Sequence, residues 1–78
     1  MKELIEYIAR SLVDDPTQVH VSLVRGGSMA NLELQVAKED MGRVIGKRGR
    51  VANAMRLLLR VAVAREGKRA TLDIVEPR

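Results

Sequence analysis

One stretch decides the fold of this chain: Val44-Ile45-Gly46-Lys47-Arg48-Gly49-Arg50-Val51, in which two glycines flank two cations with apolar residues on both sides. Gly46 can end one helix in a left-handed conformation, and Gly49 leaves the first amides of the next helix open to an approaching group. Lys47 and Arg48 then lie in a tight turn before a helix N-terminus, where the backbone N–H groups and the macrodipole favour an anion. We therefore expect two helices joined by a turn that binds a repetitive anion, such as a nucleic-acid backbone.

Hydrophobic periodicity predicts the elements around this turn. Apolar residues at helical spacing predict helices at 2–13, 39–45 and 50–65, and alternation predicts strands at 19–23, 31–36 and 71–75. Pro16 ends the first helix, Gly67 caps the third, and Gly26-Gly27-Ser28 joins the first two strands in a hairpin. The order α-β-β-α-α-β predicts one α+β domain spanning residues 1–78, with three helices on one face of a three-stranded sheet.

Charge is divided unevenly along the chain, whose net charge is +4. Residues 1–40 carry four cations and seven anions, a balance of −3, whereas residues 41–78 carry ten cations and three anions, a balance of +7. A basic face of this kind is expected of a polyanion binder, and the excess falls on the segment that contains the glycine turn. The alternative is a solvated surface rich in arginine.

Aromatic residues are nearly absent, since Tyr7 is the only one. RNA-recognition motifs, OB folds and cold-shock domains read bases by stacking them on several aromatic rings, so this composition excludes those folds. A groove lined by aliphatic side chains remains compatible with it.

The glycine turn, its apolar flanks and the order of elements resemble the type II KH domain, in which a VIGxxGxxI signature forms a GXXG loop that clamps about four nucleotides. The resemblance covers nearly the whole chain and is closest to the small bacterial KhpA family of single-domain KH proteins. It implies a mixed sheet and single-stranded RNA binding in the cytoplasm, as an RNA chaperone or post-transcriptional regulator. It also implies a homodimer, or a heterodimer with a second, larger KH protein (KhpB).

The candidate RNA-binding residues follow from the turn. Lys47 and Arg48 would contact phosphate, and the glycines of the turn would admit the backbone. The flanking residues expected to extend this site are Arg43 and Arg50 for phosphate, Asn53 for a nucleotide or for solvent, and Ile45, Val51 and Ala54 as an apolar floor. Lys68 and Arg69 are expected beside the groove as secondary phosphate contacts.

The helix at 50–65 has an apolar surface wider than one core requires. Asn53, Arg56 and Arg60 form a narrow polar stripe, and apolar residues cover most of the remainder. The spare apolar face predicts a dimer interface formed by Leu58, Leu59, Val61 and Ala62. Burial of the helix within its own small domain is the alternative reading. A protein-interaction module with weak or nonspecific nucleic-acid binding is the second functional hypothesis.

Other chemistries are not supported by the sequence. Gly42 to Lys47 has three residues between its glycines, where a nucleotide-binding P-loop needs four, and Arg48 replaces the Ser or Thr that would reach magnesium. The single histidine, His20, has no motif partner, and the lack of cysteine excludes disulfides and thiolate metal sites. We therefore expect no enzyme, cofactor, metal or small-molecule substrate. No export signal or membrane-spanning run is recognised, and we expect a cytoplasmic protein without membrane contact.

Overall fold

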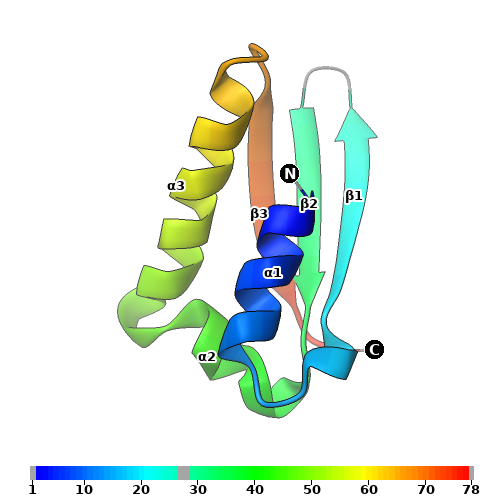
Figure 1. The fold of residues 1–78 in the computed structure, drawn as a ribbon, viewed down its shortest axis with the longest axis vertical. Helices are drawn as coiled ribbons and strands as arrows, with labels where there is room; N and C mark the ends of the chain where they lie inside the picture. Colours follow the sequence, from blue (N-terminus) through cyan, green and yellow to red (C-terminus); the bar gives the residue numbers. More distant parts are fainter. Residues whose placement is uncertain (1, 27–28, 78) are drawn as a thin grey trace.

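The computed structural model describes residues 2–26 and 29–77, which form a three-stranded sheet with helices on one face (Figure 1). The helices are α1 (Lys2–Leu12), α2 (Met41–Ile45) and α3 (Arg50–Ala64), and the strands are β1 (His20–Gly26), β2 (Met29–Gln35) and β3 (Arg69–Val75). Short 3-10 turns connect some of them: η1 (Pro16–Gln18), η2 (Lys38–Asp40) and η3 (Lys47–Gly49). This order confirms the predicted α-β-β-α-α-β arrangement.

The sheet is mixed and has the order β1-β2-β3, with β1 antiparallel to β2 and β2 parallel to β3. Parallel strands need a crossover, which α2, the glycine turn and α3 provide. Leu34 pairs with Val21 on β1 and with Ile74 on β3, so aliphatic side chains form rows on the face toward the helices. Strand β3 is an edge of this sheet, and α3 packs alongside it.

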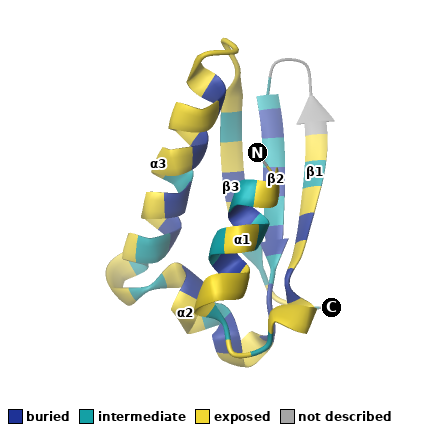
Figure 2. Ribbon diagram, in the orientation of Figure 1, coloured by how far each residue is buried: buried dark blue, intermediate teal, exposed yellow. Residues whose placement is uncertain are grey.

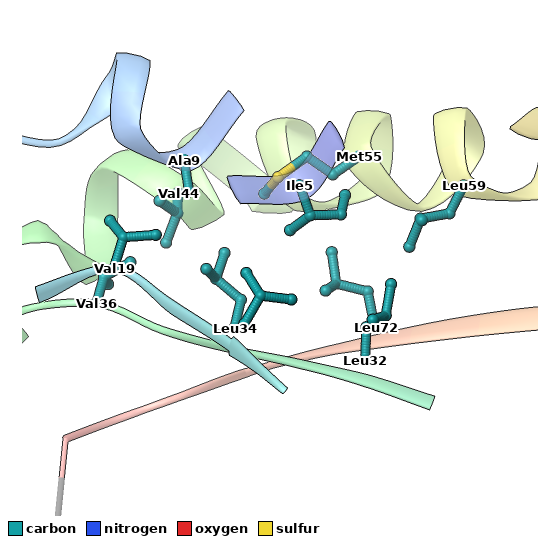
Figure 3. Packing of buried hydrophobic residues seen from close by; sticks show 11 residues of the cluster. Ile5, Ala9, Val19, Leu32, Leu34, Val36, Val44, Met55, Leu59 and Leu72 are labelled. Carbon is teal, nitrogen blue, oxygen red and sulfur yellow. The ribbon is translucent and has the colours of Figure 1, made fainter. Parts of the chain in front are cut away.

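The hydrophobic core lies between this face of the sheet and the three helices (Figure 3). Its buried members are Ile5, Ala9, Val19, Val21, Leu32, Leu34, Val36, Val44, Met55, Leu59 and Leu72. Leu59 is 0% exposed, so the prediction that it contacts a partner chain is wrong. It projects from α3 toward the sheet, and its burial stabilises the monomer by about 1.5–3 kcal/mol.

The predicted element bounds differ from the observed ones at a few places. Helix α1 ends at Leu12, one residue before the expected end. The helix expected at 39–45 is divided into η2 and α2, which begins at Met41. The predicted Gly26-Gly27-Ser28 turn includes residues 27 and 28, which lie outside the described residues.

The cap predicted for the long helix is present. Gly67 has a φ of +65°, and its N–H donates to the Ala64 carbonyl oxygen at 3.1 Å. The N–H of Lys68 donates to the Val63 carbonyl oxygen at 3.3 Å. These two bonds form a Schellman motif, which ends α3 and directs the chain into β3.

Two findings bear on other kinds of function. Among residues 2–26 and 29–77, no helix is long and apolar enough to cross a membrane. In the same residues, no three His, Asp or Glu side chains are grouped as a metal site would require.

Candidate nucleic-acid interface

The turn between α2 and α3 is built on two glycines with positive φ. Gly46 has a φ of +77° and a ψ of 171°, and Gly49 has a φ of +76° and a ψ of 14°. The N–H of Gly46 donates to the Gly42 carbonyl oxygen at 2.9 Å and completes α2. The N–H of Gly49 donates to the Gly46 carbonyl oxygen at 3.1 Å and closes the turn. Side chains are disfavoured in both conformations; the sequence predicted this for Gly46, and the positive φ of Gly49 is a finding of the structure.

The two glycines are required for different reasons. A Cβ atom at Gly46 would lie 2.5 Å from Cγ2 of Val51 and 2.9 Å from its backbone nitrogen, so the first turn of α3 fills the space. A Cβ atom at Gly49 would meet nothing closer than Nδ2 of Asn53, at 3.8 Å. Gly46 is therefore fixed by both conformation and packing, whereas Gly49 is fixed by conformation alone.

Lys47 and Arg48 form the tip of this turn, and both are exposed. Arg48 has a φ of +59° and a ψ of 24°, a left-handed conformation that costs a non-glycine residue about 1–2 kcal/mol. Within the described part of the chain, neither cation has an ion-pair partner. Backbone strain and unpaired charge thus coincide at the position where the sequence predicted phosphate contacts.

The flanking residues predicted for the site lie around the turn. Arg50 begins α3 and is exposed. Ile45 ends α2 and is 37% exposed, whereas Val51 is half-buried against the core. Ala54 is exposed further along α3. Cations that can contact a phosphate therefore lie beside an accessible apolar surface that can contact a base, and a bound nucleotide needs both.

The polar stripe of α3 connects the turn to the edge of the sheet. Arg56 donates from Nε to the Leu72 carbonyl oxygen at 3.1 Å and from Nη1 to Oδ1 of Asn53 at 3.1 Å. Asn53 thereby lies between the turn and β3. Arg56 satisfies a carbonyl that the edge strand would otherwise leave to solvent.

Between α3 and β3 lies a hollow of about 230 Å³, which we call the α3–β3 groove. Its lining residues are Arg56, Arg60, Ala70, Thr71, Leu72 and Asp73. The sequence indicated the two arginines as part of a polar stripe, but it did not place them in the site. Their role depends on the pairing of β3, which cannot be obtained from the helix alone.

Arg43 has a different place from the one predicted. Its Nη2 lies 2.8 Å from Oδ2 of Asp14, and its Nε lies 3.2 Å from Oδ1 of Asp40. Asp40 is buried and also accepts the backbone N–H groups of Asp14 and Asp15. Two carboxylates therefore offset the charge of Arg43, which joins α2 to the loop after α1 instead of standing free for phosphate.

Lys68 and Arg69 do not flank the glycine turn. Arg69 begins β3, which runs back along α3 from its C-terminal end (Figure 1). Because α3 has 15 residues, about 22 Å of helix separates these cations from the turn. The two cations therefore lie at the far end of α3 from the turn, and their predicted role as secondary phosphate contacts stays a prediction.

The side of α3 that faces away from the sheet is exposed (Figure 2), and an apolar strip of Leu57, Leu58, Val61 and Ala62 is among its exposed residues. Leu57 is 58% exposed, Leu58 46% and Val61 64%, and Ala62 beside them is exposed. The spacing of three and four residues makes these side chains neighbours on one helix face. Three of the four residues predicted to form a dimer interface are thus accessible.

The KhpA/KhpB KH-domain family model matches residues 2–74, which include the glycine turn and the groove. The chain belongs to this family. The RNA-binding protein KhpA of Clostridium perfringens is 51% identical over 75 residues, which cover 96% of this chain and 100% of that protein. The RNA-binding protein KhpA of Chlamydia trachomatis is 44% identical over 78 residues, the full length of both. These relatives are named for binding RNA, and the family is not enzymatic, in agreement with the prediction of no enzyme.

Solved structures of Era contain the same fold. Era from Aquifex aeolicus aligns with a TM-score of 0.55 at 17% identity, over 96% of this chain and 29% of that chain. A second Era structure, in complex with a segment of 16S ribosomal RNA, aligns with a TM-score of 0.56. At this identity the likeness concerns the fold alone.

Proposed function

We propose that this chain binds single-stranded RNA at the GXXG turn. The observation that carries the proposal is the pair of exposed, unpaired cations, Lys47 and Arg48, between two glycines at the start of a 15-residue helix. Arg48 can make a forked contact with a phosphate, and Lys47 supplies a point charge. Membership of a family whose relatives are named RNA-binding proteins favours RNA over DNA.

The bases of the strand would lie over the turn and along the α3–β3 groove. Ile45 and Val51 offer an apolar surface beside the phosphate contacts, and Asn53 offers an amide that can donate and accept. Contacts to phosphate position a strand, and contacts to base edges specify it. If about three phosphates are neutralised, log affinity should fall with log salt at a slope of about −2.

Membership of the family supports a proposal for the cellular role. We propose a cytoplasmic RNA chaperone or post-transcriptional regulator that holds unpaired segments without chemistry on them. Modest affinity at one domain would rise when two domains bind the same strand, because the second contact becomes intramolecular.

The apolar strip of α3 supports a second candidate function, protein interaction. We propose that Leu57, Leu58, Val61 and Ala62 form a contact with a second copy of the chain or with KhpB. Sedimentation of the wild type and of a Leu58→Asp/Val61→Asp variant tests this, because both side chains are exposed and their replacement leaves the core intact. A monomeric variant and a dimeric wild type are expected. A wild type that stays monomeric with and without KhpB would contradict the proposal.

Backbone NMR tests the RNA-binding site directly. We expect a pool of ten-nucleotide single-stranded RNAs to shift the amide resonances of residues 46–53 and those of β3 beside the groove. Shifts confined to α1 and β1 would contradict the proposal.

A further inference from the structure

A second hollow lies at the other end of α3, beside the turn that leads into β3. It has a volume of about 350 Å³, and we call it the distal pocket. Its lining residues are Met29, Arg60, Val63, Ala64, Lys68, Arg69, Ala70 and Thr71. None of these residues belongs to the GXXG turn.

The distal pocket combines an apolar floor with a basic rim. Met29, Val63, Ala64 and Ala70 supply the apolar surface. The rim holds the cations Arg60, Lys68 and Arg69, and none of the described residues that line the pocket carries a carboxylate. Guanidinium planes and apolar side chains accept an unstacked base, and cations accept the phosphates on either side of it.

The charges of this rim are available to a ligand. Arg60 and Arg69 are exposed, and neither has an ion-pair partner among the described residues. Nζ of Lys68 lies 3.7 Å from Oε2 of Glu66, but both side chains are at least half exposed, so water and salt weaken this pair. The pocket is therefore complementary to an anion.

The distal pocket continues the α3–β3 groove. The two hollows share Arg60, Ala70 and Thr71, so a chain lying in one enters the other. The 15 residues of α3 separate the turn from the distal pocket by about 22 Å. At about 3.4 Å per stacked nucleotide, about six nucleotides span this length, and an unstacked strand needs fewer.

We propose that the distal pocket binds a further nucleotide of the same RNA strand, with its base on the apolar floor and its phosphates on Arg60, Lys68 and Arg69. The inference rests on the proposed function, because it requires that the turn holds the first part of the strand. It extends the bound segment beyond the four nucleotides that a GXXG loop clamps.

RNAs of different lengths distinguish binding at the GXXG turn from binding at the distal pocket, because only the longer RNA reaches both. We would measure the affinity of oligouridine RNAs of four and ten nucleotides for the wild type and for a Lys68→Gln/Arg69→Gln variant. The control is Lys38→Gln/Arg65→Gln, which removes the same charge from two exposed residues that line neither hollow. An Ala64→Glu variant places a carboxylate in the pocket at an exposed helical position.

The ten-nucleotide RNA should bind the Lys68→Gln/Arg69→Gln variant at least about fivefold more weakly than it binds the control, with a salt slope smaller by about 1.4. Ala64→Glu should cause a similar loss. The four-nucleotide RNA should bind all these proteins equally. If the ten-nucleotide RNA binds the variant as tightly as the control, the distal pocket is not part of the site.

Failure of the proposed function would look different. In that case the four-nucleotide RNA would not bind, or its binding would persist when Lys47 and Arg48 are replaced. An oligoglutamate peptide that shifts the resonances of the distal pocket, when ten-nucleotide RNA does not, would assign the pocket to an acidic protein and overturn the inference.

Discussion

Replacing Gly46 with alanine tests whether the turn depends on this glycine for packing as well as for conformation. With φ at +77° and ψ at 171°, the residue occupies a region that is almost exclusive to glycine and costs other residues about 1–3 kcal/mol. The new Cβ would also lie 2.5 Å from Cγ2 of Val51, and shifting the packed helix to relieve such overlap costs about 1–3 kcal/mol. The two effects together predict a loss of about 2–6 kcal/mol.

Gly49→Ala is the matched control. Its Cβ meets nothing closer than 3.8 Å, so only the left-handed conformation is penalised, at about 1–2 kcal/mol. The reduced entropy of the unfolded chain offsets about 0.4–1 kcal/mol in both variants, so it cancels when they are compared. Urea unfolding followed by circular dichroism should therefore find Gly46→Ala less stable than Gly49→Ala by about 1–4 kcal/mol, because the packing overlap is absent at Gly49. A domain of 78 residues has a stability of about 4–12 kcal/mol, so the difference is a large fraction of the whole.

A double variant separates the two contributions at Gly46. In a Val51→Ala background Cγ2 is absent, so Gly46→Ala should cost less than in the wild type, although the 2.9 Å contacts with the Cβ atom and the backbone nitrogen of residue 51 remain. Equal stability of the Gly46→Ala and Gly49→Ala proteins would refute the packing argument. An unchanged cost in the Val51→Ala background would refute the part assigned to Cγ2.

Other perturbations test the surroundings of the turn. Asp40→Asn should lower the free energy of unfolding in urea by about 1–3 kcal/mol, because the buried carboxylate accepts hydrogen bonds from two backbone N–H groups and pairs with a guanidinium. The control Glu39→Gln, at an exposed position, should change the free energy of unfolding by less than about 0.5 kcal/mol. If Asp40→Asn and Glu39→Gln changed the free energy of unfolding equally, the Asp40 carboxylate would not have the stabilising role described. Arg48→Gly should be more stable than Arg48→Ala by about 1 kcal/mol, since only glycine relieves the left-handed strain, yet both should weaken RNA binding equally in a filter assay. If Arg48→Ala bound RNA more tightly than Arg48→Gly, the loss of binding could not be assigned to the loss of the Arg48 charge. Hydrogen bonds from Thr17 and Gln18 hold the pKa of Asp15 below its ordinary value of 3.8, so its stabilisation is present above pH 3.8 and is lost as pH falls through the lowered pKa. The free energy of unfolding of Asp15→Asn should therefore change less with pH in the acid range than that of the wild type. If the two proteins had the same pH profile, the hydrogen bonds to Asp15 would not contribute to stability.

The elements and the turn could be predicted from the sequence because local rules determine them. Positive φ at Gly46 could be predicted because this glycine ends one helix directly before the turn, whereas for Gly49 the sequence predicted only the need for a missing side chain. The cap at Gly67 follows from its place just after the last helical residues. The element order follows from periods of 3.6 and 2 residues, which change at the predicted boundaries.

Residues whose role depends on distant partners could not be placed in the same way. Arg43 is offset by Asp14, which is 29 positions away, and no local pattern indicates that contact. Leu58 and Leu59 are neighbours on an apolar helix, and only the packing of the sheet shows that Leu59 faces inward. Lys68 and Arg69 could be predicted to lie beside the groove, but their distance from the turn depends on the direction of β3 along α3, which no local pattern gives.

The claim that RNA binds at the GXXG turn is tested most directly by reversing the charge of Lys47 and Arg48 and measuring RNA binding. The wild type, Lys47→Asp/Arg48→Asp and the charge-matched control Lys38→Asp/Arg65→Asp would be titrated with the ten-nucleotide RNA pool at two salt concentrations, with circular dichroism to establish folding. The three phosphates neutralised at the turn alone predict that a fourfold rise in salt weakens the wild type by at least about 16-fold. The folded turn variant should not bind, and the control should bind within about threefold of the wild type, because its replaced cations lie outside the site. A folded turn variant that binds as tightly as the control would contradict the assignment of the RNA site to the GXXG turn.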